Sequence, residues 1–225
     1  KLARSWPADL IIVAADEKAC PIQIFKQGIA EKIFKKAPCS VLLARDSQPT
    51  KQAYKVLIAL DSESISLKSV LDMVRAASCP ENTSFHILTV AKPNYSVGSF
   101  EPNAFVVVNS LEEHRLYISS LQKATDELKR KLENSFASFN FENSVVEGQP
   151  EDIILEFAKF AESDLILLGF TGKSEFNHRI FGSVSQTVAL KGHCSVQVTR
   201  SSVTPLLKRV SEPTPASKLH RASGF

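Results

Sequence analysis

The 225-residue sequence has no long apolar run, no excess charge outside its last segment and few cysteines, and each absence narrows the class of protein. No apolar stretch approaches the roughly 18 residues of a membrane-spanning helix, which argues against direct insertion into a membrane. Residues 201–225 hold four basic residues and one acidic residue, and they account for the whole net charge of +3. The neutral remainder lacks the basic face expected of a nucleic-acid-binding protein.

The four cysteines show neither CxxC spacing nor histidine partners at the spacing of a zinc site, so no metal site is predicted. Scattered thiols in apolar surroundings are typical of a reducing compartment, and we expect a cytoplasmic protein. Cys39 and Cys194 are expected to be small core residues.

The sequence contains a repeat with an offset of 155 residues. The apolar run Asp9–Ala14 corresponds to Asp164–Gly169, and Cys39–Leu43 corresponds to Cys194–Val198. Across residues 9–45 and 164–200, nine identities occur, clustered at the two ends. Continuous apolar runs of this length predict strands buried on both faces of a parallel sheet. A fixed offset indicates duplicated architecture, here a half copy followed by a whole copy.

We predict four parts: a degenerate half domain at 1–45, a linker at 46–53, a complete domain at 54–200 and a disordered basic tail at 201–225. In the complete domain, apolar runs alternate with amphipathic segments, which predicts a doubly wound, Rossmann-like parallel sheet of five strands. The expected strands are Lys55–Leu60, Ser84–Val90, Ser144–Glu147, Asp164–Gly169 and Ser195–Thr199. The expected helices are Ser66–Ala77, Ser110–Phe136, Glu151–Ala161 and Ser183–Leu190, with residues 91–109 as a loop. The long helix carries a leucine stripe beginning at Leu111, which we expect to pack against the sheet.

Glycines follow the predicted strand Asp164–Gly169 in a pattern suited to phosphate. Gly169 and Gly172 come directly after the strand, and nine residues later Gly182-Ser183 opens a helix. Glycines let backbone N–H groups approach a phosphate, and a helix N-terminus adds positive potential. The hydroxyls of Ser183 and Ser185 can donate to phosphate oxygens. Simpler interpretations remain open, with the glycines forming only a tight turn and Ser183 only capping the helix.

This spacing resembles the nucleotide-binding signature of the ATP-binding universal stress proteins. The resemblance covers 54–200 and, as half of a second such domain, 9–45. It implies that Asp61 faces the ribose and phosphates, that backbone groups near Val90 read adenine, and that the turn at Gly148 lies beside the base. It implies ATP, AMP or ADP as ligand, with Mg²⁺. The site residues implied are Ala59, Leu60, Asp61, Val90, Gly148, Leu168, Gly169, Thr171, Gly172, Gly182, Ser183, Val184 and Ser185.

The half copy has lost these glycines. Ala14, Glu17 and Gln27 stand where Gly169, Gly172 and Gly182 stand in the whole copy. The added side chains and the negative charge of Glu17 oppose phosphate binding, so we expect one nucleotide per chain. In this family the last strand commonly pairs with its counterpart, across a homodimer or within a tandem chain. We expect Ser195–Thr199 to pair with Ser40–Ala44 of this chain, with the missing first half supplied from elsewhere, or else with a second copy.

The sequence leaves three functions to compare. The first is a nucleotide-dependent regulatory or stress-response module that acts on a protein partner. The second is a non-catalytic cytosolic regulatory or interaction domain of a larger protein, such as a membrane transporter. The third is an enzyme that uses ATP. A Walker loop and a His-x-Gly-His motif are absent, and Leu60–Ser64 contains no glycine. These absences argue against sustained catalysis and leave at most slow ATP hydrolysis.

Overall fold

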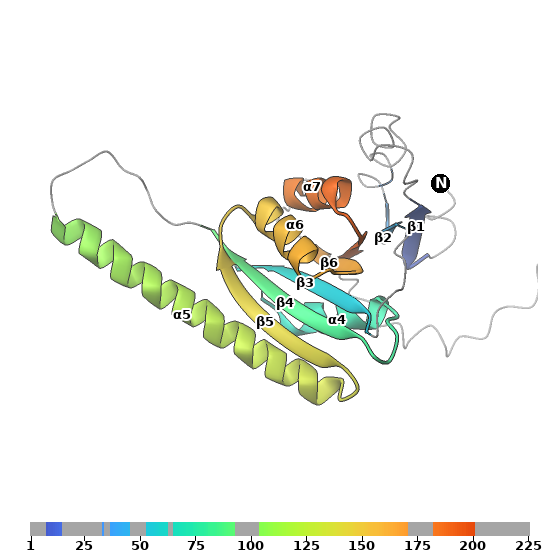
Figure 1. The fold of residues 1–225 in the computed structure, drawn as a ribbon, viewed down its shortest axis with the longest axis horizontal. Coiled ribbons are helices and arrows are strands. Elements are labelled where there is room, and N and C mark those ends of the chain that lie inside the picture. The colour runs from blue at the N-terminus through green and yellow to red at the C-terminus, as the bar shows by residue number, and fades with distance from the viewer. Residues whose placement is uncertain are drawn as a thin grey trace, which may run out of the picture.

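The structure is a computed structural model that describes residues 8–14, 33, 37–45, 53–62, 65–92, 104–170 and 182–200. These residues build one seven-stranded sheet with the order β1-β2-β7-β6-β3-β4-β5. Figure 1 shows β1 (Leu10–Ala14) and β2 (Ser40–Ala44) at one end of the sheet, and β5 (Asn140–Glu147) at the other. The predicted tail at 201–225 and most of the predicted linker fall outside the described residues.

The α/β fold class is confirmed by the alternation of strands and helices from residue 55 onward. Five strands run parallel to one another: β7 (Ser195–Arg200), β6 (Leu165–Phe170), β3 (Lys55–Asp61), β4 (Ser84–Ala91) and β5. The helices of the described part are α4 (Leu67–Ala76), α5 (Ala104–Ser135), α6 (Pro150–Phe160) and α7 (Ser183–Lys191). The boundaries lie close to those expected, except at the starts of α5 and β5.

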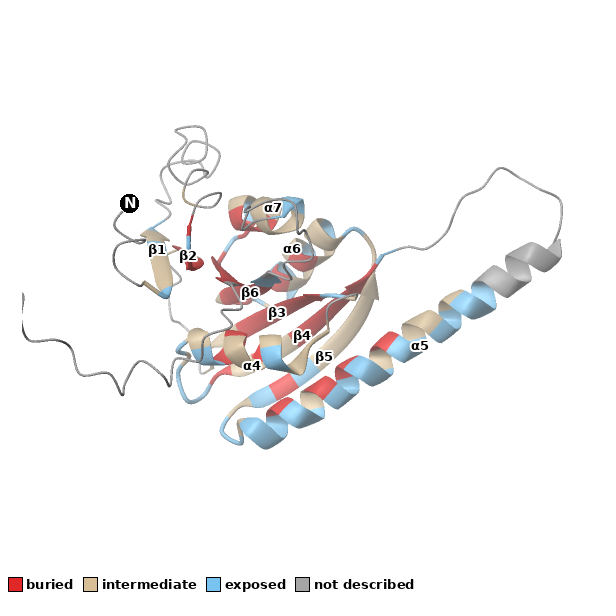
Figure 2. Ribbon diagram, turned by 180° about the vertical axis from the view of Figure 1, so that it is seen from behind, coloured by how far each residue is buried: buried red, intermediate tan, exposed pale blue. Residues whose placement is uncertain are grey.

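An apolar core lies on each face of the sheet. Because side chains alternate along a strand, Leu57 and Ile166 face α6 and α7, whereas Ile58 and Leu167 face α4 and α5. All four side chains are fully buried. Figure 2 shows the central strands as buried elements between the helices. The near-continuous apolar runs in the sequence follow directly from this burial on both faces.

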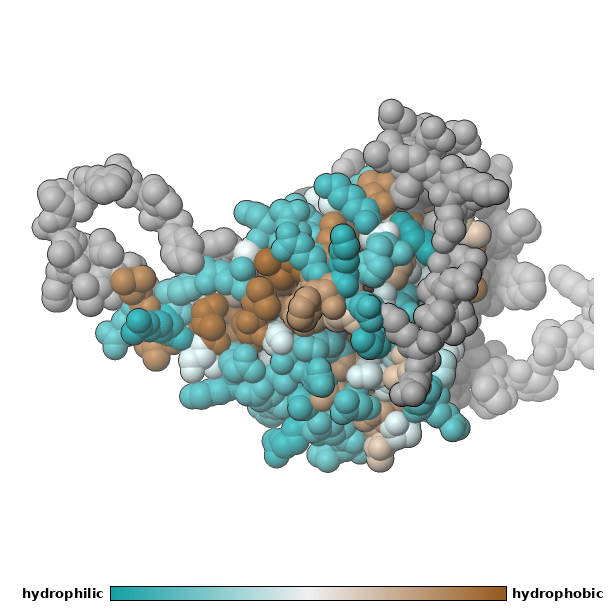
Figure 3. All heavy atoms as spheres, in the orientation of Figure 1, coloured by the Kyte–Doolittle hydropathy of each residue, from teal (hydrophilic) through white to brown (hydrophobic). Residues whose placement is uncertain are grey.

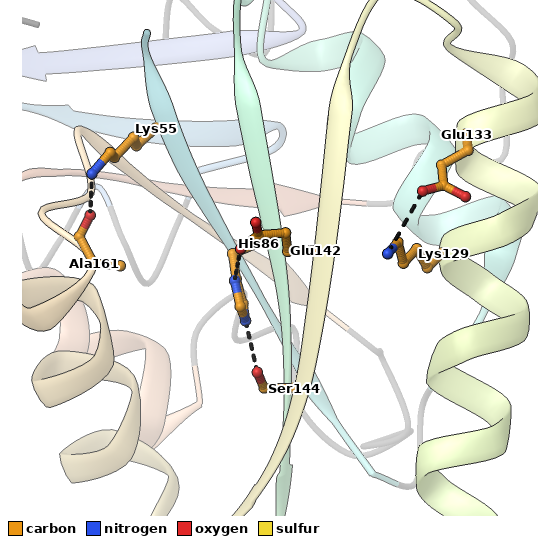
Figure 4. A network of polar contacts seen from close by, with 7 residues as sticks. All are labelled: Lys55, His86, Lys129, Glu133, Glu142, Ser144 and Ala161. Atoms are coloured by element: carbon orange, nitrogen blue, oxygen red, sulfur yellow. Dashed lines mark hydrogen bonds and ion pairs between the residues drawn. The ribbon is translucent and has the colours of Figure 1, made fainter.

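Polar side-chain contacts join neighbouring strands away from their carboxyl ends, where the predicted site lies. The backbone N–H of Lys55 donates to Asp164 Oδ2 at 2.9 Å, so the aspartate that opens β6 holds the start of β3. Figure 4 shows Lys55 Nζ donating to the carbonyl of Ala161 and His86 Nε2 within 3.0 Å of Ser144 Oγ. These contacts fix the register of β3, β4 and β5.

Helix α5 differs from the sequence prediction at its N-terminus. It begins at Ala104 rather than Ser110, so residues expected to form a loop are helical. The three valines at 106–108 have weak helix propensity, which the helix as a whole overrides. Leu121, Leu128 and Leu132 are buried against the sheet, but Leu111 is 51% exposed, and its expected packing is wrong. The N-terminal part of α5 projects beyond the sheet and exposes hydrophobic side chains (Figures 1 and 3).

The strand pair β1–β2 repeats the geometry of β6–β7. Both pairs are parallel, with Leu10 opposite Ser40 in one and Leu165 opposite Ser195 in the other. All five partners in β1–β2 map onto partners in β6–β7 by the same 155-residue offset. This equivalence supports the prediction that residues 1–45 are half of a second domain, which remains a prediction.

The antiparallel pairing expected between Ser40–Ala44 and the last strand is present. Val41 lies opposite Val198, Leu42 opposite Gln197, and Leu43 opposite Val196. Leu42 and Gln197 are themselves counterparts at the offset of 155. If each residue is replaced by its counterpart, the pair Val41–Val198 becomes the pair Val196–Leu43. A local pseudo-twofold axis therefore passes between Leu42 and Gln197.

Strand β1 is not buried on both faces, contrary to the expectation from its apolar run. Ile11 and Val13 pack against the core on the α7 side. Ile12 points the other way and is 64% exposed, whereas its counterpart Leu167 is fully buried. The difference arises because β1 is the end strand of the sheet and β6 is a central strand.

The guanidinium of Arg45 ties β2 to the end of α7, a contact that sequence analysis missed. Its Nη1 donates to the carbonyl of Cys194 at 2.9 Å and its Nη2 to that of Ala189 at 2.6 Å. The backbone N–H of Arg45 donates to Ser195 Oγ at 3.0 Å. Burial lowers the pKa of Arg45, against a smaller opposing effect of Cys194. A cation here also suits the negative end of the α7 dipole.

Candidate functional site

The residues singled out in the sequence gather at one edge of the sheet, where the parallel strands β6, β3, β4 and β5 end. Asp61 at the end of β3 lies opposite Val90 in β4, and Ala59 lies opposite Leu168 in β6. In open α/β sheets, ligands bind outside this carboxyl edge. The register thus aligns the predicted site residues that lie in β3, β4 and β6 across neighbouring strands.

The end of β3 combines buried apolar residues with one exposed carboxylate. Ala59 and Leu60 are buried, whereas Asp61 is exposed. The strand therefore fixes the backbone position of Asp61 firmly while leaving its carboxylate accessible to a ligand hydroxyl group or a cation.

The turn after β5 requires the glycine at position 148. The N–H of Gly148 donates to the carbonyl of Ala91 at 3.1 Å, which joins the ends of β4 and β5. Gly148 has φ +155°, and a Cβ there would lie 2.8 Å from Ile153 Cγ1 in α6. Backbone conformation and packing thus account for this glycine without a ligand.

A histidine–carboxylate pair lies beside this turn and was not anticipated from the sequence. His114 Nε2 of α5 lies 2.9 Å from Glu147 Oε2, at the last residue of β5. Both side chains are largely buried, with exposures of 16% and 26%. The pair fastens the middle of α5 to the carboxyl edge, close to Gly148. Only tertiary structure brings together two residues that are 33 positions apart.

The surroundings of Gly169 and Gly182 do not demand a glycine as strictly as those of Gly148 do. A Cβ at Gly169 would lie 3.3 Å from Met73 Sδ, a flexible side chain that can adjust. Gly182 has φ −75° and ψ 169°, an ordinary extended conformation, and a Cβ there would meet no atom of the described residues within 4 Å. Neither backbone strain nor packing against the described residues therefore explains a glycine at position 182.

Helix α7 starts one residue earlier than the capping hypothesis assumed. Gly182 is its N-cap, without a side-chain capping bond, and Ser183 is its first helical residue. Gly182 and Ser183 are exposed, and Val184 and Ser185 are partly buried. Ser185 Oγ donates to the carbonyl of Gly182 at 3.0 Å, within the first turn. The N–H groups of this turn are the donors that a helix N-terminus offers to an anion.

Part of the predicted site cannot be placed. Thr171 and Gly172 lie outside the described residues, as do Glu17 and Gln27 of the half copy. Ala14, the counterpart of Gly169, ends β1. Within the described ranges, no three His, Cys, Asp or Glu side chains gather as a metal site would require. Cys39 and Cys194 are buried, and burial raises the pKa of the Cys194 thiol to about 12. No helix in the described part has the length and apolar character needed to cross a bilayer.

Comparison with known proteins identifies the class. The family model described as the universal stress protein family matches residues 54–200. The chain therefore belongs to the universal stress protein family. This match spans the described strands and helices from β3 to β7.

Individual relatives agree with this assignment. Universal stress protein MJ0531 of Methanocaldococcus jannaschii is 25% identical over 148 residues, which are 65% of this chain and 81% of that protein. Universal stress protein MJ0577 of the same organism is 29% identical over 119 residues, 51% of this chain and 64% of its own length. The second match thus spans less than two thirds of that relative.

A solved structure extends the similarity beyond the complete domain. The structure of a putative universal stress protein from Pseudomonas aeruginosa UCBPP-PA14 has a TM-score of 0.56 and 15% identity, and it covers 88% of this chain and 66% of that one. Residues 54–225 alone make up less than 88% of the chain, so the similarity to that structure must include residues before Tyr54. At this identity the comparison shows the fold alone.

Proposed function

We propose that residues 54–200 bind ATP, or AMP or ADP, and act as a nucleotide-dependent regulatory or stress-response module in the cytoplasm. The observation that carries the proposal is Gly182, at an exposed helix N-terminus beside the carboxyl edge of the sheet, where neither backbone conformation nor packing against the described residues requires a glycine. Close approach of a phosphate is a physical reason for a glycine at such a position.

The rest of the edge supplies complementary groups for such a ligand. The N–H groups of the first turn of α7 suit the phosphates, and the Asp61 carboxylate suits ribose hydroxyls or a phosphate-bound Mg²⁺. The ends of β4 and β5, joined through Ala91 and Gly148, offer backbone groups to the base. Membership in the family and the arrangement of these groups support the same ligand class. The proposed protein partner would respond to whether nucleotide is bound.

Titration calorimetry of wild type and two charge variants tests the proposal. The Gly182→Asp variant should weaken binding of ATP with Mg²⁺ more than about tenfold, because a new negative charge would face the phosphates; tenfold corresponds to about 1.4 kcal/mol. Asn140→Asp adds the same charge at the first residue of β5, on the opposite edge, and should bind as wild type does. Wild type should also prefer ATP to GTP. Equal ATP affinity in all three proteins would show that the phosphate position is wrong.

A non-catalytic interaction domain of a larger protein is the second candidate. The observation that favours it is the hydrophobic surface of α5, where Leu111 and Leu116 are 51% and 66% exposed. If wild-type protein binds no adenine nucleotide in the same calorimetry, the nucleotide-dependent module is ruled out and the interaction domain is the function that remains.

A further inference from the structure

Apolar packing holds the start of β5 more firmly than its end. Strand β5 is an end strand of the sheet, and on its outer side no strand among the described residues pairs with it. Phe141, near its start, is fully buried in the core on the α5 face. From Asn143 to Glu147, by contrast, every residue is only partly buried. The carboxyl end of β5 therefore depends on other contacts for its position.

The His114–Glu147 pair supplies such a contact. Glu147 is the last residue of β5, and its Oε2 lies 2.9 Å from His114 Nε2 of α5. A carboxylate oxygen accepts, so the Nε2–H group of the histidine donates. Both side chains are largely buried, and a hydrogen bond shielded from water is stronger than an exposed one. Helix α5 thus holds the end of β5 in place.

The end of β5 in turn places the backbone that the proposed function assigns to the base. Glu147 lies opposite Ala91, the last residue of β4, in the parallel register. The next residue, Gly148, donates its N–H to the carbonyl of Ala91 at 3.1 Å. A shift of Glu147 would therefore move the backbone groups at the ends of both strands.

We propose that the His114–Glu147 pair is a positioning element for the base end of the nucleotide site and sets how strongly adenine is preferred to guanine. The inference rests on the proposed function, because it concerns the same ligand. His114 Nδ1 and Glu147 Oε1 are buried, so the pair acts through the backbone that it holds rather than by touching the base.

The effect on selectivity follows from how the two bases differ. Adenine and guanine present different donors and acceptors on the six-membered ring. Backbone groups can tell them apart only if they are held at hydrogen-bond distance and angle to one of the two. A loosened strand end loses the bonds to adenine and has few bonds to guanine to lose.

Thermodynamic linkage makes the effect reciprocal. If the pair strengthens ATP binding, bound ATP must stabilise the pair by the same factor. His114 lies between Leu111 and Leu116 on α5, and both of these leucines are exposed. Nucleotide binding should therefore slow hydrogen exchange in this part of α5, which carries the exposed apolar surface.

Titration calorimetry of the full chain with ATP and with GTP, each with Mg²⁺, tests the proposal. His114→Ala and Glu147→Ala should each weaken ATP binding about three- to tenfold, as for one lost hydrogen bond to the base, and change GTP binding by less than about twofold. The double variant should lose little more than either single variant, because both remove the same contact. His114→Gln should recover most of the loss, since its amide can replace the Nε2 donor.

A second histidine and a second measurement serve as controls. His193→Ala removes an exposed histidine just before β7 and should bind both nucleotides as wild type does. Hydrogen exchange over residues 111–118 should slow when ATP is added to wild type or His193→Ala, but not when it is added to His114→Ala. Glu147→Gln, which keeps the shape of the side chain, replaces any alanine variant that fails to fold, and it should also lower the preference for ATP.

The outcomes separate this inference from the proposed function. Equal losses of ATP and GTP affinity would mean that the pair supports the fold as a whole, and the proposal would be wrong. Unchanged ATP affinity in His114→Ala, or protection of α5 by ATP that persists in that variant, would also overturn it. If wild type binds no ATP, the proposed function itself is refuted, whereas the other results concern the pair alone.

Discussion

Replacing Arg45 should loosen the contact between the two copies, and the size of the effect follows from its hydrogen bonds. The guanidinium donates to the carbonyls of Cys194 and Ala189. Hydrogen bonds from a charged group contribute about 1.5–3 kcal/mol each, and the lower value suits a partly exposed side chain. A cation at a helix C-terminus adds about 0.3–1 kcal/mol. We expect Arg45→Ala to lower the free energy of unfolding by about 3.5 kcal/mol.

The assay is thermal unfolding followed by hydrogen exchange. In a domain of about 150–250 residues, each kcal/mol shifts the Tm by about 2–4 °C, so the Tm of Arg45→Ala should fall by about 7–14 °C. Faster exchange should be concentrated in β2 and at the C-terminal end of α7, which the side chain joins. Arg45→Lys should give a smaller loss, because one ammonium group does not reproduce the fork that reaches two carbonyls.

The control for this series is Arg115→Ala, on the exposed surface of α5. It removes the same charge without breaking a contact between β2 and α7, so its Tm should stay within about 1 °C of wild type, as surface substitutions usually do. If Arg45→Ala and Arg115→Ala shift the Tm equally, the guanidinium contacts contribute nothing specific and the reasoning is refuted.

Three further predictions concern the half copy, the strand pairing and pH. Because Ala14, Glu17 and Gln27 replace the glycines in the half copy, the saturated protein should hold one adenine nucleotide per chain in equilibrium dialysis. Two nucleotides per chain would contradict the loss of the second site. Cysteines replacing Leu42 and Gln197, which lie opposite each other, should crosslink within one chain on a non-reducing gel; crosslinks only between chains would favour a homodimer. Burial lowers the pKa of His86 below 6.5, against a smaller opposing effect of Glu142, so the unfolded state binds the proton more readily and stability should fall as pH drops below about 6.5. His86→Gln should therefore show a smaller Tm difference between about pH 7.5 and about pH 5.5 than wild type does. If the difference is unchanged, the pH dependence of stability comes from other groups.

The sequence predicted the fold well because the strands are central. Runs such as Leu165–Leu168 are apolar throughout because they are buried on both faces, and the 155-residue offset was reproduced pair by pair in the register. Ile12 shows the limit of the same reasoning. Its run looks identical in the sequence, but burial on the second face depends on a neighbouring strand and helix that the pattern alone does not supply.

The candidate site was predictable in outline for a similar reason. Glycines and strand ends are local features, so Asp61, Gly148 and Gly182 could be assigned to one edge of a parallel sheet. The His114–Glu147 pair and the Arg45 contacts could not, because each joins residues far apart in the sequence. A histidine on an amphipathic helix and an arginine after a strand carry no local signal of their partners.

The pseudo-twofold axis between β2 and β7 has a consequence for how this interface can change. In a symmetric homodimer every substitution is made twice, and the residue on the axis must face itself. Here the axis joins Leu42 to Gln197, whose side chain is buried with 2% exposure. Two copies of the same strand would place either two leucines or two buried amides at that point, and the second amide would need partners of its own. Because both sides belong to one chain, each can mutate independently, and a single buried amide opposite a leucine is enough to make the two sides chemically distinct.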